Sequence, residues 1–396
     1  MMKTLRPLLL TVFFLQFASA QTTFNKPSEA YESARRPLTE WKSAVESRRI
    51  PATPTPPQEE VRQRFKQLCP LFSIKDESGE ELYWLAKLCE GDHEKALTAI
   101  ALYLSGSELT HAADARWLLA TQQMQKTGSW ESSWPTIKLI AQQDPVQEWF
   151  WHYRVAIDDE SDDNPKTSLE WSKELYAILL ARSKSDVPQL APISLFYALI
   201  AGSDLVYRYH LSGDEPNAAK VLAEMNGLAQ TLPDKVWPPP ELRWANLEMQ
   251  PAPAIPVTKI LGKNSSASLV QPGRVEVISF FFLACVPCRA ELPALDDLQK
   301  RYETQKLLVA DVTTMKANDS SSPPDLEHSL EALRAKSAPD ISMVITSDET
   351  LSIYGIAQFP VVAIVDKRGR VRYIGQTFDF EDDDSAGKLV HQLIEE

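Results

Sequence analysis

Hydrophobic residues recur every three or four positions through the first two thirds of the chain, and this spacing is typical of amphipathic helices. Two stretches show it most clearly, residues 82–104 and residues 204–229. Each has an apolar face, then a Gly-Asp turn, and then a second amphipathic run. The same plan continues more weakly around Gly128 and Asp163. We therefore predict an α-helical repeat-like domain over residues 60–232.

The turns between these helical pairs recur at fairly regular intervals. From Gly91 onward, successive turns are separated by about 37, 35 and 50 residues, compared with about 34 residues in a repeat built from a helical pair. This pattern loosely resembles degenerate tetratricopeptide-type (TPR-like) helical hairpins. Stacked hairpins form a concave surface that could hold a partner protein. Packing between stacked helices is the alternative explanation for the Trp and Tyr residues in this region.

The periodicity changes from about residue 257 onward. Short apolar runs with two-residue alternation now alternate with amphipathic segments, which indicates strands and helices in turn. The predicted strands span residues 274–283, 306–312, 341–347, 360–366 and 371–376, and the predicted helices span residues 286–302, 326–336 and 385–395. We therefore predict a multidomain chain, in which the all-α helical-hairpin domain precedes an α/β domain over residues 257–396.

Proline-rich stretches separate these parts of the chain. One lies near the N-terminus, within an arm that we assign to residues 21–59. Two others bracket a short segment between the helical and the α/β regions. Proline-rich segments are typical of connections between domains. We therefore predict a Pro-rich linker over residues 233–256.

The first residues have the pattern of a secretory signal peptide. Lys3 and Arg6 form a basic start, and an apolar centre and a small-residue site ending at Ala20 follow. The apolar centre is about half as long as the roughly 20 residues that cross a bilayer, which disfavours a membrane span. We expect removal of residues 1–20 and a periplasmic or secreted protein with no stable membrane span.

Charge and composition exclude several other classes. The chain has 41 Lys and Arg residues against 54 Asp and Glu residues, a formal net charge of −13. Binding to nucleic acid requires clustered basic residues, so no nucleic-acid partner is expected. The sequence contains no G-x-S-x-G, phosphate-loop or H-E-x-x-H motif, and we expect no cofactor. Its six histidines are scattered and its four cysteines form two separate pairs, so no metal site is expected either.

The first cysteine pair, Cys69 and Cys89, flanks a short segment between predicted helices. In an oxidising compartment two such cysteines pair when they are close. We predict a structural disulfide that joins the first two helices and acts mostly by restricting the unfolded chain.

The second pair, Cys285 and Cys288, lies in the stretch FFFLACVPCRAELP, where a predicted strand gives way to a predicted helix. The backbone N–H groups at a helix start are unpaired and favour a thiolate at Cys285. The thiolate is the reactive species, and a second cysteine one turn further on can close a disulfide with the first. Pro287 suits a first helical turn, whereas Pro293 should kink the helix.

A structural disulfide between Cys285 and Cys288 is the alternative. Such a bond closes a very short loop, so its entropic contribution to stability would be small. We therefore favour a redox-active pair.

The segments CVPCRAELP, Gly355 to Pro360, and IVDKRGRVRYIGQ together resemble the extracytoplasmic thioredoxin-like thiol–disulfide oxidoreductases of the TlpA type. The resemblance covers about the last third of the chain and implies a thioredoxin-like fold there. It also implies that Cys285 is the nucleophile, that Cys288 is the resolving thiol and that Pro360 follows a cis peptide bond. Glu291 matches the family's partly buried acid, which handles protons near the resolving sulfur.

The sequence departs from this family at two positions. Ala284 stands where the family usually has Trp before the first cysteine, and Phe359 stands where Thr is common before the cis proline. Together with Pro287 and Pro360, these residues are expected to contact the substrate, and Phe359 to present its backbone to an extended peptide.

Our hypothesis is an extracytoplasmic oxidoreductase that exchanges disulfides with protein substrates, with a partner protein held by the helical domain. It requires a reachable sulfur at Cys285 that lies close to Pro360. The alternative is a non-catalytic helical-repeat scaffold with a degenerate thioredoxin-like binding domain. The direction of electron flow stays open.

Overall fold

The structure is a computed structural model of the 396-residue chain. It describes residues 24–47, 56–107, 109–143, 145–186, 190–234, 236–262, 268–302, 306–319, 322–376 and 385–396. The predicted signal peptide, residues 1–20, lies outside the described residues.

The chain divides into two compact units, residues 1–136 and residues 137–396. The helices of the first unit are α1 (Pro27–Glu46), α2 (Gln58–Leu68), α3 (Glu80–Leu88), α4 (His93–Leu104) and α5 (Ala112–Thr127), with short 3-10 turns at Cys69–Leu71, Ile74–Asp76 and Trp130–Ser132. Helix α6 (Trp134–Gln143) crosses the division. The segment expected as an N-terminal arm thus contains the 20-residue helix α1.

Helices α3 and α4 form the hairpin predicted over residues 82–104. Leu85 and Leu88 of α3 pack with Ala99 and Ile100 of α4, and all four are fully buried. Asp92 ends the turn between the helices, and its Oδ1 accepts a hydrogen bond of 3.2 Å from the backbone N–H of Lys95. The side chain thereby satisfies one of the free N–H groups at the start of α4. The helical pair is confirmed.

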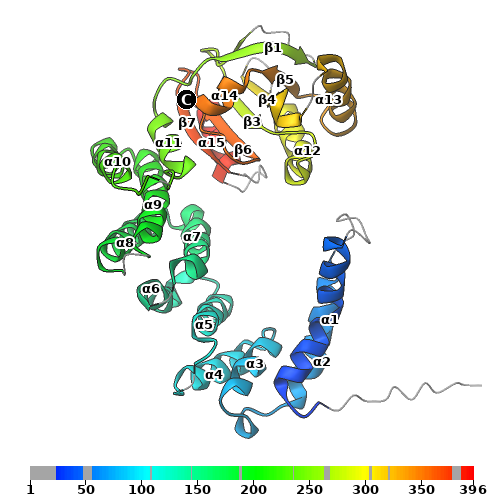
Figure 1. The fold of residues 1–396 in the computed structure, drawn as a ribbon, viewed down its shortest axis with the longest axis vertical. Helices are drawn as coiled ribbons and strands as arrows, with labels where there is room; N and C mark the ends of the chain where they lie inside the picture. The colour runs from blue at the N-terminus through cyan, green and yellow to red at the C-terminus, as the bar shows by residue number, and fades with distance from the viewer. Residues whose placement is uncertain are drawn as a thin grey trace, which may run out of the picture. The chain divides into compact units, whose positions relative to one another are not determined.

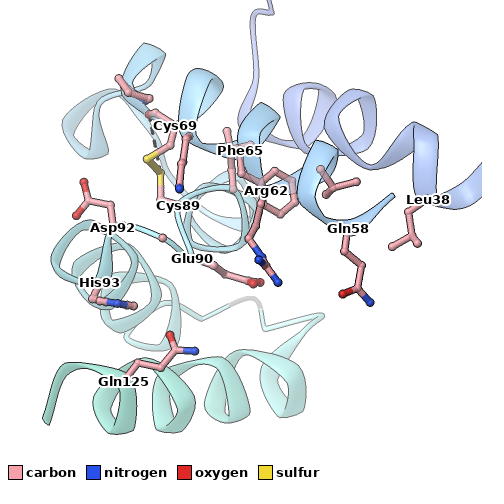
Figure 2. A pocket seen from close by; sticks show the side chains of 15 residues that line it. Leu38, Gln58, Arg62, Phe65, Cys69, Cys89, Glu90, Asp92, His93 and Gln125 are labelled. Carbon is pink, nitrogen blue, oxygen red and sulfur yellow. Dashed lines mark hydrogen bonds between the residues drawn. A yellow bond between two sulfur atoms is a disulfide. The ribbon is translucent and has the colours of Figure 1, made fainter. Parts of the chain in front are cut away.

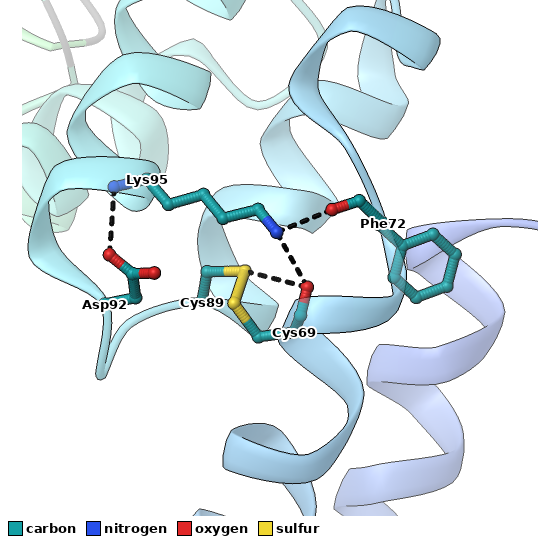
Figure 3. The surroundings of a disulfide bond; sticks show 5 residues. All are labelled: Cys69, Phe72, Cys89, Asp92 and Lys95. Atoms are coloured by element: carbon teal, nitrogen blue, oxygen red, sulfur yellow. Dashed lines mark hydrogen bonds between the residues drawn. A yellow bond between two sulfur atoms is a disulfide. The ribbon is translucent and has the colours of Figure 1, made fainter.

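The predicted disulfide between Cys69 and Cys89 is present and buried. It joins the end of α2 to the end of α3, not the first two helices, because α1 precedes both. The ammonium group of Lys95 donates to the carbonyl oxygens of Cys69 and Phe72, at 2.8 and 2.6 Å, and so holds the chain beside the disulfide (Figure 3).

The second unit opens with helices that pack as antiparallel neighbours. They are α7 (Val146–Asp163), α8 (Pro165–Ser185), α9 (Ala191–Ser212), α10 (Glu215–Ala229) and α11 (Pro240–Leu247). Gly213 ends α9 with a left-handed backbone (φ 74°), which costs glycine little, and Asp214 then caps α10. This is the turn predicted within residues 204–229, and the α9–α10 hairpin is confirmed.

A mixed sheet of seven strands follows in the same unit. The strands are β1 (Ile255–Leu261), β2 (Ser268–Leu269), β3 (Val275–Phe280), β4 (Leu307–Thr314), β5 (Ser342–Thr346), β6 (Val361–Val365) and β7 (Val371–Gln376), in the order β2-β1-β5-β4-β3-β6-β7. Strands β3, β4 and β5 are parallel, and the outer strands pair antiparallel. The three central strands are buried throughout, as both faces of a parallel sheet require.

Helices cover both faces of this sheet (Figure 1). On one face lie α12 (Val286–Arg301), α13 (Pro323–Ser337) and α15 (Ser385–Glu395), whose apolar residues pack with alternate residues of the strands. On the other face, residues of α11 and Tyr354, just after α14 (Asp348–Ile353), complete a second core. The predicted fold class, an all-α region followed by an α/β region with helices on both faces of its sheet, is confirmed.

The predicted strands and helices of the last third are all present. Strands β1 and β2, helix α14 and a 3-10 turn at Lys316–Asn318 were not predicted. Pro293 lies inside α12 without ending it. The segment predicted as a linker, residues 233–256, contains α11 and the first residues of β1. The predicted domain boundaries stay a prediction.

Replacement of Gly202 by Ala should destabilise the second unit. Gly202 lies where α9 meets α8 and α10, and an added Cβ would collide with Met225 Sδ and lie 2.9 Å from Cε2 of Tyr176. Both neighbours are buried and cannot move aside freely. We expect a loss of about 1–3 kcal/mol in the free energy of unfolding, measured by urea titration.

Gly227→Ala in α10 is the matched control, because no atom lies within 4 Å of its added Cβ. It should gain roughly 0.5–1 kcal/mol from helix propensity. Equal effects of the two substitutions would contradict a close approach at Gly202.

Candidate active site

Cys285 and Cys288 form a disulfide at the start of α12. Cys285 is the N-cap residue of this helix, and the backbone N–H of Cys288 donates to its Sγ at 3.2 Å. The sulfur thus takes the place that a Ser or Asp side chain oxygen usually has at a helix start. The N–H donor and the helix dipole both favour a thiolate at Cys285 once the disulfide is reduced.

The loop that carries Cys285 is anchored to β4 and to the turn after it. Thr313 Oγ1 donates to the carbonyl oxygen of Phe281 at 2.8 Å. The side chain of Asn318 accepts from the backbone N–H of Leu283 at 2.7 Å and donates to Thr313 at 2.7 Å. These bonds fix the path from β3 to α12. Asn318 was not singled out from the sequence, because nothing in the sequence around it indicates that it contacts this loop.

The loop before β6 lies beside the cysteine loop. The Phe359–Pro360 peptide bond is cis, the isomer that the family resemblance implies. Val361 pairs with Phe280, the last residue of β3, so Pro360 lies next to the point where the chain leaves β3 for Cys285. The ring of Phe359 contacts the ring of Phe282 edge to face, with centroids 5.3 Å apart. The loop before β6 and the loop that leads to Cys285 therefore lie side by side, and the closeness of Pro360 to the Cys285 sulfur stays a prediction.

The sulfur of Cys285 is less accessible than the hypothesis expected. In the disulfide form Cys285 is only 4% exposed, whereas Ala284 and Pro287 on either side are exposed. Val286, between the cysteines, is 59% exposed and adds an apolar surface that sequence reasoning had not included. The cause is the packing of the disulfide into the core beneath α12. In the disulfide form, little of Cys285 is therefore accessible to a substrate.

Two acidic residues lie near the cysteine pair, one in α12 and one in the strand β4 beneath it. Glu291 is partly buried, one turn after Cys288, and both its carboxylate oxygens are shielded from solvent. Asp311 of β4 pairs with Ser279 of β3. Side chains alternate along a strand, and Val309 belongs to the core under α12, so Asp311 points to the same face.

Burial raises the pKa of Asp311 to about 7, and the nearby Glu291 carboxylate acts in the same direction. Ser279 opposes this shift, yet neither carboxyl oxygen of Asp311 accepts a hydrogen bond of ordinary length from the described residues. An isolated buried carboxylate is costly, so the neutral acid is favoured below this pH. Asp311 was missed from the sequence, although an acid inside the apolar run LLVADVTT is a usable signal.

A cavity of about 860 Å³ lies in the first unit, beside the Cys69–Cys89 disulfide. Figure 2 shows Arg62, Glu90 and Gln125 around it, and α2 and the turn between α3 and α4 supply most of its wall. It contains no part of the Cys285–Cys288 pair.

Among the described residues, no group of three or more His, Cys, Asp or Glu side chains is arranged to hold a metal ion. None of the described helices is long and apolar enough to span a bilayer.

Comparisons with known proteins each cover about a third of the chain. No family model matches the sequence. The thioredoxin-like protein YneN of Bacillus subtilis is 28% identical over 127 residues, which cover 32% of this chain and 70% of that protein. Among solved structures, the thioredoxin-like superfamily protein SPOA0173 is 19% identical with a TM-score of 0.32, over 37% of this chain and 96% of that one. A thiol-disulfide isomerase from Corynebacterium glutamicum is 17% identical with a TM-score of 0.30, over 36% of this chain and 94% of that one.

Replacement of Asp311 by Asn should stabilise the protein at alkaline pH and not at acid pH. In the wild type the unfolded chain loses this proton near pH 4 and the folded chain near 7, so stability falls as pH rises between these values. Asn has no proton to lose. Because the pKa of Asp311 in the folded chain lies roughly three above its value in the unfolded chain, the free energy of unfolding should rise by up to about 4 kcal/mol at pH 8. At pH 4 it should hardly change.

Urea unfolding at both pH values measures this difference. Asp234→Asn, at an exposed position, is the control and should change neither value by more than about 0.5 kcal/mol. A gain for Asp311→Asn that is equal at pH 4 and pH 8 would show that Asp311 ionises normally.

Proposed function

We propose that this chain is an extracytoplasmic thiol–disulfide oxidoreductase of the TlpA type that acts on protein substrates. The observation that carries this proposal is the Cys285 sulfur at the N-cap of α12, which accepts the N–H of Cys288 and lies beside the Pro360 loop. A structural disulfide would not require a helix start that favours the thiolate. The similarity to thioredoxin-like protein YneN supports the same kind of chemistry.

The reaction needs two exchange steps. The thiolate of reduced Cys285 attacks a substrate disulfide, a mixed disulfide forms, and one substrate sulfur leaves as a thiolate. The thiolate of Cys288 then attacks Cys285, the second substrate sulfur leaves, and the Cys285–Cys288 disulfide forms. The substrate gains two electrons and the dithiol loses two. A partner dithiol has to restore the reduced pair, and the same steps in reverse would oxidise a substrate.

Substrate contact in this proposal falls on the residues around the disulfide. Ala284 and Pro287 are exposed on either side of Cys285, and Phe359, which is partly buried against Phe282, precedes the strand β6. An extended substrate segment pairing with this backbone would bring its sulfur to Cys285. In the disulfide form Cys285 is covered by its neighbours. In the reverse reaction, a substrate thiolate that attacks Cys285 would therefore have to displace some of these side chains.

The remaining parts of the proposal concern the helices and the location. We propose that the helical region is TPR-like and holds a partner protein, with the cavity beside Cys69 and Cys89 as the place of contact (Figure 2). The basic and apolar start of residues 1–20 supports export and a periplasmic or secreted location. The oxidising conditions there suit the Cys69–Cys89 disulfide.

Replacement of Cys288 by Ser tests the proposed exchange. The reduced variant, mixed with a disulfide-bonded peptide, should accumulate a covalent adduct at Cys285, because no second thiol can release it. Non-reducing electrophoresis and mass spectrometry of the adduct are the measurements. Reduced wild-type protein should in addition be alkylated at Cys285 by iodoacetamide.

Cys285→Ser is the matched control and should give no adduct. The scaffold alternative predicts no adduct with either variant and an unreactive Cys285. That result would remove the enzymatic proposal and leave a binding protein.

Replacement of Glu291 by Gln should slow the second step and spare the first. Glu291 lies one turn from Cys288 and acts on Asp311, so we propose that it accepts the proton of the Cys288 thiol. Acid quenching of the reaction with glutathione disulfide should show a mixed disulfide that decays at least about tenfold more slowly. Glu349→Gln, at an exposed position, is the control. Unchanged decay in Glu291→Gln would assign the proton transfer to another group.

A further inference from the structure

A second cavity, of about 350 Å³, lies within the second unit where helices meet the edge of the sheet. Its walls come from α7, α9, α11 and β7, and none of the cysteines borders it. Five charged side chains border the cavity, namely Arg154, Asp158, Asp204, Glu241 and Glu248. Their balance of charge indicates what the cavity could hold.

Arg154, which borders the cavity, and Arg208, whose partner Asp158 borders it, are both paired. Arg154 forms an ion pair with Asp204 through two contacts, Nη2 to Oδ1 at 3.0 Å and Nε to Oδ2 at 2.7 Å. Arg208 pairs with Asp158 and donates to Ser161 Oγ at 2.9 Å. Each of these cations is therefore neutralised by one aspartate, and neither offers a free charge to an anion.

Two further carboxyl groups border the cavity without such a partner. Glu241, at the start of α11, is 8% exposed, and Glu248, just after this helix, is 6% exposed. The Oε2 atom of each is buried and accepts no hydrogen bond from the described residues. Burial raises the pKa of both groups, although the Arg154 guanidinium acts on the pKa of Glu241 in the opposite direction, so a charge on either group is costly.

Aromatic side chains form much of the remaining wall. Trp151, Tyr207 and Tyr373 border the cavity, and the rings of the two tyrosines meet edge to face at 5.2 Å. The faces of such rings attract cations, as the Arg154 guanidinium over the ring of Trp151 already shows at 5.2 Å. The hydroxyl of Tyr373 lies so close to Gly375 that any Cβ there would collide with it.

From these observations we infer that the cavity is a binding site for an organic cation, either a primary ammonium or a guanidinium group. Glu241 and Glu248 would supply the countercharge, and the aromatic rings would cover the apolar part of the ligand. A metal ion fits less well, because no group of three or more suitable ligands occurs among the described residues. The cation could belong to a small amine or to a Lys or Arg side chain of a partner protein.

The test is a binding measurement on the full chain in its disulfide form. n-Butylammonium is compared with n-butanol at constant ionic strength, by calorimetry and by the fluorescence of Trp151 and Trp244, which both border the cavity. The ammonium should bind, and the alcohol of the same shape should not. Acetyl-Ala-Lys-Ala-amide and its norleucine analogue form a second pair, and binding of this peptide alone would assign the site to a protein side chain.

Variants then identify the carboxyl groups. Glu248→Gln and, separately, Glu241→Gln should weaken binding of the bound probe by at least about tenfold, since each removes one countercharge. Both remove a buried charge and should fold, which circular dichroism checks. Glu131→Gln, at an exposed position of the first unit, should bind as the wild type does.

Equal binding of ammonium and alcohol, unchanged binding in both glutamine variants, or no binding of any probe would overturn the inference. The buried glutamates would then be neutral acids that only fill the junction. The variant with both Cys285 and Cys288 replaced by Ser should keep the binding, so this result does not depend on the proposed redox function.

Discussion

The hydrogen bond from the backbone N–H of Cys288 to Sγ of Cys285 is the contact on which the active region depends. A helix start needs acceptors for its free N–H groups, and here the acceptor is the sulfur itself. A thiolate accepts such a bond more strongly than a disulfide sulfur does, because the bond is then assisted by charge. The helix therefore favours the state in which Cys285 is a nucleophile or a leaving group. The same geometry would add nothing to a purely structural crosslink.

The sheet determines what lies beneath this sulfur. Strands β3 and β4 run parallel, so the chain leaves β3 at the same edge at which Asn318 and Thr313 can anchor the next loop. The alternation of side chains then directs Asp311 into the core under α12, where Glu291 acts on it. Two acids in one water-poor region cannot both ionise easily. The ionisation of Asp311 in the sheet is thus coupled to that of Glu291, which α12 carries.

The central strands and α12 could be predicted because buried strands and amphipathic helices have distinct periodicities. Strand β1 was missed because it is half exposed and begins among prolines, and α14 because it has only six residues. At the site, the cysteines follow from their spacing, and Pro360 follows from the resemblance. The burial of Cys285 and the contact of Phe282 with Phe359 depend on packing between distant segments, which no local pattern records. Asp311 could have been predicted from the sequence, because an acidic residue in an apolar strand is rarely buried without a specific role.

The segment between the helices and the sheet, residues 233–256, also forms backbone hydrogen bonds with β7. The N–H of Met249 donates to the carbonyl oxygen of Val371 at 2.7 Å, and the N–H of Val371 donates back to Gln250 at 3.0 Å. These bonds pair the backbone of Val371, the first residue of the edge strand β7, which would otherwise offer its polar groups to another chain. The same strand ends at Gln376, which pairs with Val361 beside Pro360. Strand β7 thus borders the cavity with its side chains, and its backbone hydrogen bonds connect the segment after α11 to the strand β6 that follows Pro360.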